Sequence, residues 1–240
     1  MDRRKISPRE TQLLSKAQKE TLYVSLKQRI LTLDLEPGQS LDEARVAREY
    51  GLSRTPVRDV LRQLAGEGYL TIEENRGAYV ASMSHKTLRS FFQTAPTIYS
   101  AVALLAAQNW RPQQLDALKA AQAKFREAIL VSDASAMAYW SNQFHSIMGD
   151  MADNPYLSPS LQRLLIDHAR IGETFYAARD SGMQERLEDA ARHHDEFIDA
   201  IEQRDAERAK QLAVEHWALS RDNIELYVRP DPIELDVAAS

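Results

Sequence analysis

The segment from Leu52 to Leu70, LSRTPVRDVLRQLAGEGYL, concentrates cationic and hydroxyl side chains at the start of a predicted helix. Arg54, Thr55 and Arg58 lie on its polar face, although the partial positive charge of a helix N-terminus disfavours cations there. The apolar face consists of Val57, Val60, Leu61 and Leu64. An arginine fork matches the two acceptors on a guanine edge, and each such pair contributes ~1–3 kcal/mol of discrimination. We therefore expect Arg54 and Arg58 to contact base edges of DNA and Thr55 to contact a phosphate.

A simpler alternative places the two arginines on a solvated helix face, in local ion pairs with Asp59 or Glu49. The surrounding elements decide between the two interpretations. A first helix beginning at Thr21 stops at the Pro37–Gly38 turn, and a short second helix over 41–50 ends at Gly51. This order is typical of a helix-turn-helix, which favours DNA contact.

Two short apolar stretches, 69–72 and 79–80, follow the third helix and are joined by the turn EENRG. They predict a β-hairpin, so the N-terminal part reads as a winged helix-turn-helix. Arg76 and Gly77 lie at the tip of this wing. A glycine there allows the backbone to approach the sugar-phosphate surface, and the arginine suits a minor groove.

Three of the six histidines form a second candidate site: His145, His194 and His216. Neutral imidazoles on facing helices can bind a divalent metal in a chain that has no cysteine. Any one of them is more simply a surface histidine or a hydrogen-bonded core residue. Spacing along the sequence does not by itself bring three helices together.

The composition is that of a globular protein, with 44% hydrophobic residues among 240. The absence of cysteine excludes disulfides and thiolate metal sites. No apolar run approaches the ~20 residues of a membrane span, and the basic N-terminus lacks the apolar stretch of a secretory signal. We expect a soluble cytoplasmic protein without membrane partners. Residues 1–85 carry 14 Lys and Arg against 12 Asp and Glu, while the rest carry 16 against 23, which suggests two parts with different tasks.

The C-terminal part reads as helix throughout, so the expected fold is mainly α, with a bundle of six or seven helices behind the winged helix-turn-helix. The breaks fall at Pro112, at SDAS, at DNPYLSP and at RDSG. The predicted helices span 86–108, 112–131, 133–152, 157–178, 184–203 and 205–228.

The stretch LEPGQSLDEARVAREYGLSRTPVRDVLRQLAGEGYLTIEENRGAYV resembles the DNA-binding domain of the GntR family of bacterial transcription regulators. The matching motifs are PG..L, SRTPVR.VL..L..EG.L and RGA.V, in order and at family spacing. The resemblance implies that Arg54, Thr55 and Arg58 contact bases and phosphates and that Gly77 is the wing-tip glycine. A further family arginine on the second helix corresponds to Ala44, and the adjacent Arg45 is a candidate replacement.

The C-terminal part is similar to the FCD effector domain of the FadR subfamily, through FHSIMGDMADNPYL, H..FI.AI..RD...A and a histidine in the last helix. The resemblance implies a divalent metal (Zn, Ni or Mn) bound by His145, His194 and His216 beside a small-molecule cavity. The family's aspartate ligand is replaced by Ser141, a weak ligand that is expected to lower the affinity. The resemblance also implies an effector in the cavity, with an organic acid among the candidates.

The first helix of many FCD domains carries R..LE, whose arginine can face the ligand. This chain has Ala95 and Tyr99 at those places. The candidate replacements in the effector pocket are Tyr99, Arg170 and Tyr176. We expect a basic arm at 1–18, the winged helix-turn-helix at 19–81, a linker at 82–86, the effector-binding and dimerisation domain at 87–230, and a tail at 231–240.

The resulting hypothesis is a metabolite-responsive transcription regulator, most commonly a repressor in such families, which binds a palindromic operator as a homodimer. An alternative is a metal-dependent hydrolase that uses the three histidines, with Glu215 or Asp195 as general base and an accessory helix-turn-helix. No phosphate loop, serine elbow or paired-carboxylate motif supports an enzyme. A DNA-binding structural protein without a ligand is a third possibility, but the C-terminal part is larger than dimerisation requires.

Overall fold

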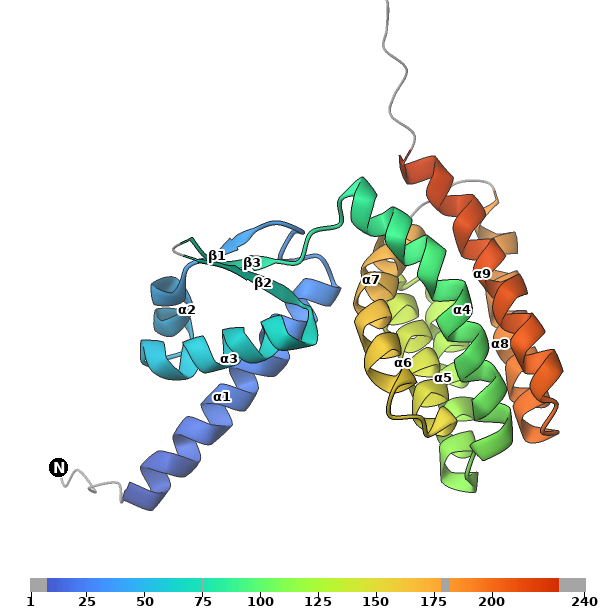
Figure 1. Ribbon diagram of the computed structural model, residues 1–240, viewed down its shortest axis with the longest axis horizontal. Coiled ribbons are helices and arrows are strands. Elements are labelled where there is room, and N and C mark those ends of the chain that lie inside the picture. Colours follow the sequence, from blue (N-terminus) through green and yellow to red (C-terminus); the bar gives the residue numbers. More distant parts are fainter. Residues whose placement is uncertain (1–7, 75, 178–181, 229–240) are drawn as a thin grey trace, which may run out of the picture.

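The computed structural model describes the backbone of residues 8–74, 76–177 and 182–228, with side chains between residues 16 and 219 of those ranges. The described chain is mainly helical, as the sequence predicts, with a small winged domain beside a helical bundle (Figure 1). The N-terminal elements are α1 (Pro8–Leu31), β1 (Ser40–Leu41), α2 (Glu43–Glu49), α3 (Arg54–Glu67), β2 (Leu70–Glu73) and β3 (Gly77–Val80). The bundle elements are α4 (His85–Asn109), α5 (Pro112–Leu130), α6 (Ala134–Ala152), α7 (Leu157–Ala177), α8 (Met183–Glu202) and α9 (Ala206–Val228).

Local capping chemistry sets several of these boundaries. The Asp42 side chain accepts from the Arg45 amide at the start of α2, and Asp133 accepts from the Ala136 amide at the start of α6. At the other end of α3, Gly68 has a φ of 92°, a left-handed conformation that glycine adopts without strain. A side chain at this position would also clash with Arg163 of α7. Gly68 therefore both ends the helix and lets α7 pack close to it.

The prediction of an N-terminal arm at 1–18 is wrong for residues 8–18, because the first helix, α1, begins at Pro8 and not at Thr21. Residues 1–7 and the expected tail at 231–240 lie outside the described residues. The sheet also contains a strand that the sequence analysis missed: β1 pairs antiparallel with β3, giving the order β1-β3-β2. At two residues, β1 is too short to show an alternating pattern. The bundle begins at His85, inside the segment expected to be a linker.

One hydrophobic core holds the winged domain together and reaches into the bundle. Leu22 and Leu26 of α1 pack with Leu61 and Leu64 of α3, all of them fully or almost fully buried. Ile166 of α7 belongs to the same cluster. In the bundle, α4 packs against α6, α7, α8 and α9, and its alanines and aromatic residues line the centre of a second core. The two domains therefore meet through α7.

A buried charge cluster fixes this meeting point. Arg170 is fully buried, pairs with Asp167 one turn earlier on α7, and donates to the Ala81 carbonyl at 2.6 Å. Arg163 donates to the second Asp167 oxygen at 3.1 Å. A buried guanidinium is tolerated only when it is paired and hydrogen-bonded, and here both conditions are met. None of the described helices combines the length and the apolar character needed to cross a membrane.

Replacing Asp167 with alanine should lower the free energy of unfolding by about 3–5 kcal/mol, because Arg170 would remain buried without its counter-ion. Urea denaturation measures this change. Glu202→Ala is the matched control: it removes an exposed ion pair with Lys119 at 2.8 Å and should cost less than about 1 kcal/mol. Equal losses in the two variants would contradict the structural role of Asp167.

Candidate functional site

The start of α3 presents the side chains that the sequence analysis expects to read DNA. Arg54, Thr55 and Arg58 are all exposed, while Val57 on the opposite face is fully buried. Ser53 is the N-cap residue of α3, although its side chain makes no capping hydrogen bond. A helix held from behind by its apolar face, with its first turns projecting outward, has the geometry of a recognition helix.

The ion pairs around this helix differ from those of the alternative interpretation. Arg58 donates to Glu43 of α2 at 2.7 Å, and not to Asp59 or Glu49. Asp59 pairs instead with Lys19, and Glu49 with Arg29, both on α1. More than half of the Arg58 side chain stays exposed (54%), so its pair with Glu43 is a surface contact of ~0–1 kcal/mol that a phosphate or base can replace.

The wing and α2 carry the remaining predicted DNA contacts. Arg76 is exposed between β2 and β3, with a weak pair to Glu73 at 3.3 Å. Gly77 has a φ of 99° and no atom within 4 Å of the position of a Cβ, so the wing tip is open to an approaching backbone. Arg45 is exposed on α2. The structure thus leaves every predicted DNA-contacting side chain accessible.

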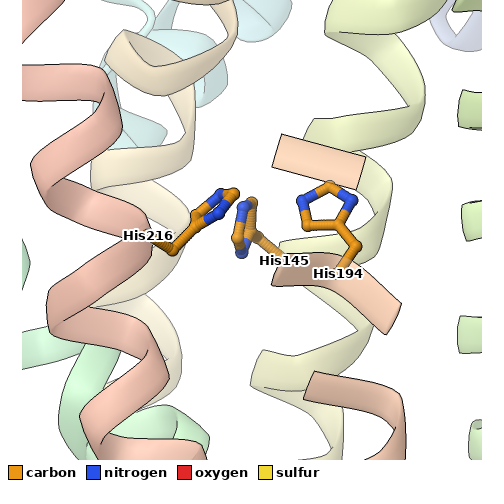
Figure 2. A group of neighbouring side chains, drawn as sticks. All are labelled: His145, His194 and His216. Atoms are coloured by element: carbon orange, nitrogen blue, oxygen red, sulfur yellow. The ribbon is translucent and has the colours of Figure 1, made fainter. Parts of the chain in front are cut away.

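The three predicted histidines converge inside the bundle from three different helices. His145 lies on α6, His194 on α8 and His216 on α9, and Figure 2 shows the three imidazoles grouped together. One ring nitrogen from each lies within 4.8 Å of the others. His145 and His194 are buried, with 3% and 0% exposure. The packing of the helices therefore brings together three histidines that their spacing along the sequence did not show to be neighbours.

The ring nitrogens in this cluster are suited to metal binding. His145 Nε2, His194 Nε2 and His216 Nδ1 are buried and have no hydrogen-bond partner among the described residues. Burial, with smaller contributions from neighbouring histidines, lowers the pKa of His145 and of His194 well below the ordinary 6.5 and that of His216 to about 3. At neutral pH the rings are uncharged, and each therefore has one nitrogen lone pair that can bind a metal ion.

Two of the remaining candidate site residues line a cavity beside the histidine cluster. Its walls include His216, Ser141 and Tyr176 together with Phe91 and Trp217. Ser141 is 1% exposed and shares a hydrogen bond with Tyr176, whose pKa burial raises to about 12. Ser141 is therefore hydrogen-bonded within the cavity wall, and Tyr176, a predicted effector contact, lines the same cavity.

A second, smaller cavity lies between Tyr99 and the histidines and is lined by His145, His168 and His216. The Tyr99 hydroxyl lies 2.8 Å from His168 Nδ1, and the His168 ring centroid lies 4.8 Å from that of His145. His168 borders both cavities, although it was not among the residues predicted for the site. Its position could have been inferred from the sequence, because His168, Gly172 and Tyr176 recur every four residues and so share one face of α7.

The prediction that Arg170 lies in the effector pocket is wrong. It lines neither of these cavities and instead binds Asp167 and the Ala81 carbonyl at the domain boundary. Successive residues of a helix project about 100° apart, so residue 170 points away from the face that carries His168 and Gly172.

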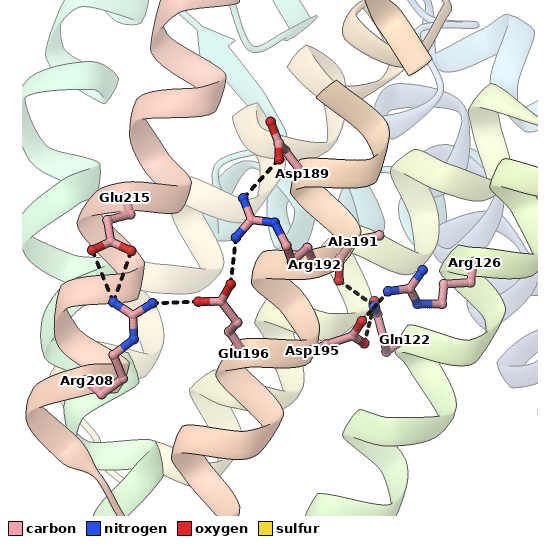
Figure 3. Close-up of polar contacts among 9 residues, drawn as sticks. All are labelled: Gln122, Arg126, Asp189, Ala191, Arg192, Asp195, Glu196, Arg208 and Glu215. Atoms are coloured by element: carbon pink, nitrogen blue, oxygen red, sulfur yellow. Dashed lines mark hydrogen bonds and ion pairs between the residues drawn. The ribbon is translucent and has the colours of Figure 1, made fainter. Parts of the chain in front are cut away.

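The two carboxylates considered as general bases for a hydrolase are engaged elsewhere. Figure 3 shows Glu215 bound to Arg208, while Asp195 binds Arg126 and the Gln122 amide. Glu196 and Arg192 of α8 extend the ion pairs of Arg208. Asp195 links α8 to α5, while Glu215 pairs within α9, so both carboxylates are already held by other side chains. The hydrolase alternative is thereby left without its proposed base.

The buried neutral histidines predict an acid-sensitive fold. Because burial lowers the pKa of His168 from 6.5 to about 4, the unfolded chain binds a proton in this range that the folded chain does not. The metal-free protein should therefore lose stability as the pH falls from about 6.5 towards 4, by up to ~1.4 kcal/mol per pH unit for each such histidine. Urea denaturation with a chelator, between pH 7.5 and 5, measures this slope. His168→Gln should make it shallower, and an unchanged slope would contradict this origin.

Comparisons of the two domains and of the whole chain with known proteins all point to the same family. Residues 18–80 match the model of the bacterial regulatory proteins of the gntR family, and residues 92–219 match that of the FCD domain. The chain is 25% identical over 197 residues to the HTH-type transcriptional repressor RspR of Escherichia coli K12, covering 82% of this chain and 84% of the relative. It is 28% identical over 200 residues to the HTH-type transcriptional repressor GlaR of the same organism, covering 81% and 90%.

Among solved structures, E. coli McbR/YncC matches with a TM-score of 0.71 at 20% sequence identity, covering 87% of this chain and 96% of that one. At this identity the likeness concerns the fold. The FCD match spans more than half of the chain, and the GntR match covers the winged domain that precedes it. The chain therefore belongs to the GntR family of transcription regulators, with an N-terminal winged helix-turn-helix and a C-terminal FCD domain.

Proposed function

We propose that this protein is a cytoplasmic repressor that binds a palindromic operator as a homodimer and responds to a small organic acid held beside a divalent metal. The observation that carries the proposal is the arrangement around α7, one face of which borders the histidine cavities while another touches the DNA-reading domain. A dimer presents two recognition helices to successive half-sites, which is the symmetry that a palindrome requires.

The proposed metal ligands are His145, His194 and His216. Nitrogens bound to one tetrahedral zinc ion lie ~3.4 Å apart, given a bond of ~2.1 Å, so a cluster within 4.8 Å needs only about 1 Å of side-chain movement. The smaller cavity has a volume of about 10 Å³, close to the minimum for one water or ion. A bound Zn, Ni or Mn ion would supply positive charge for an anionic oxygen of the effector.

The larger cavity sets the size and chemistry of the proposed effector. Its volume of about 40 Å³ is enough for a few heavy atoms without rearrangement. Phe91, Phe175 and Trp217 form an apolar wall, while His168 and the Arg186 side chain add polar groups. This combination suits a small carboxylic acid, whose anionic end faces the histidines and whose body contacts the aromatic rings.

The proposed response follows from the two-sided position of α7. An effector shifts a conformational equilibrium only by binding one arrangement better than another. Ile171, Gly172 and Tyr176 border the cavity, and Ile166 and Arg170 contact the winged domain within the same rigid helix. A small movement of α7 therefore changes the position of the DNA-reading domain.

Arg54→Ala and Arg58→Ala should each weaken binding to a selected operator by about 10- to 100-fold, because each removes a base contact worth ~1–3 kcal/mol. Selection of binding sequences from random DNA provides the operator, and fluorescence anisotropy at fixed salt measures the affinity. Arg111→Ala removes an exposed arginine of the bundle as a charge-matched control and should leave binding unchanged. Wild-type affinity in both α3 variants would refute DNA reading by this helix.

Purified protein should bind about one divalent ion per chain, and the double substitution His194→Ala/His216→Ala should abolish that binding, since a single histidine would remain in the cluster. Metal analysis after dialysis against Zn²⁺ or Ni²⁺ measures the stoichiometry. His85→Ala, which changes an exposed histidine at the start of α4, is the control. The same stoichiometry in all three proteins would exclude the three-histidine site.

A further inference from the structure

We propose that Gln122 of α5 is a positioning residue for the metal site: it holds His194 in the tautomer that leaves Nε2 free to bind the ion. The inference rests on the metal binding proposed above and assigns a role to a residue outside the histidine cluster. Gln122 is 3% exposed and lies 3.0 Å, through Oε1, from His194 Nδ1. It thus contacts one ring nitrogen, while the other, Nε2, has no partner among the described residues.

The orientation of the Gln122 amide follows from its other contacts. Its Nε2 donates to the Ala191 carbonyl at 2.8 Å and to Asp195 Oδ1 at 2.8 Å. Figure 3 shows these contacts, with Arg126 bound to the same Asp195 carboxylate. If the amide were turned over, its oxygen would face a carbonyl and a carboxylate, both of which only accept hydrogen bonds. The amino group must therefore face these two acceptors.

The tautomer of His194 follows from the orientation of the amide. With the amino group held by Ala191 and Asp195, the Gln122 oxygen faces His194 Nδ1, and an oxygen can only accept there. Nδ1 must carry the proton, so Nε2 keeps the lone pair. The contact between Gln122 and His194 also fixes the plane of the imidazole, which stacks on the Phe144 ring at a centroid distance of 4.1 Å. A metal-binding histidine characteristically donates its other N–H to such an acceptor, which raises its basicity as a ligand.

The ion pair behind Gln122 stabilises the arrangement. Arg126 neutralises Asp195, and the side chains of both are about half exposed, at 51% and 44%. The chain of contacts therefore runs from a surface ion pair through one buried amide to His194 Nδ1, while Nε2 of the same ring is the proposed ligand nitrogen. Hydrogen bonds in such a chain polarise one another, so Asp195 strengthens the Gln122 oxygen as an acceptor.

Gln122→Met tests the inference, because it keeps the length and approximate volume of the side chain and removes the acceptor. Affinity for Co²⁺ and Zn²⁺ is measured by competition with a chromophoric chelator at fixed pH. We expect it to fall about 10- to 100-fold, as for other partners of metal-binding histidines. Gln113→Met, at an exposed position of the same helix, is the matched control and should bind as the wild type does.

A second measurement needs no metal. In histidine ¹⁵N NMR spectra of the metal-free protein, His194 should show a protonated Nδ1 in the wild type and lose this preference in Gln122→Met. Asp195→Ala removes one of the two acceptors of the Gln122 amino group and should shift the same signals partly towards those of Gln122→Met. This variant replaces Gln122→Met in the test if the Met variant does not fold.

The outcomes separate the two proposals. A wild-type protein that binds no divalent ion would overturn the proposed metal site and this inference with it. Normal metal binding together with unchanged affinity in Gln122→Met, or a wild-type His194 protonated at Nε2, would overturn the role of Gln122 alone. A loss of affinity without any change in the tautomer signals would also overturn it, because the effect would then not pass through His194.

Discussion

The burial of Arg170 is the constraint on which the relation between the two domains depends. A guanidinium without solvent requires a counter-ion and hydrogen-bond acceptors, and the acceptors of its two terminal nitrogens come from both sides of the domain boundary. Asp167 belongs to the same helix, but the Ala81 carbonyl belongs to the end of the winged domain. The two domains cannot separate at this point without exposing or orphaning the charge. Helix α7 is thereby tied to the DNA-reading domain and remains free to border the cavities on its other face.

Desolvation has a different consequence in the centre of the bundle. There it acts on imidazoles, which can lose their charge, and it lowers the pKa of each histidine in the cluster. The same burial that costs stability in acid keeps the lone pairs available at neutral pH. The Gln122 contact orients the His194 ring for metal binding, because it decides which of its two nitrogens carries the proton. Burial and one hydrogen bond thus turn ordinary core histidines into a set of candidate ligands.

The winged domain could be predicted closely from the sequence because its elements are short and punctuated by turn and cap residues. The Pro37–Gly38 turn, Gly51 and Gly68 mark boundaries that local backbone preferences enforce. Two features escaped prediction for physical reasons. β1 exists only because Ser40 and Leu41 meet β3, and α1 extends to Pro8 through a segment with little apolar periodicity. The bundle helices were predicted to within one or two residues at the ends that the structure describes, because proline and aspartate begin several of them.

The sequence by itself determined the family and the order of the helices, and it singled out the candidate DNA-contacting arginines and the three candidate histidines. It could do so because these depend on local patterns and on motifs of fixed spacing. Only the tertiary structure decided that His145, His194 and His216 meet, that His168 joins them at the cavities, and that Arg170 serves the domain boundary rather than the pocket. The physical reason is that a helix presents different residues to different neighbours. Which neighbour each face meets is set by the packing of helices far apart in the chain.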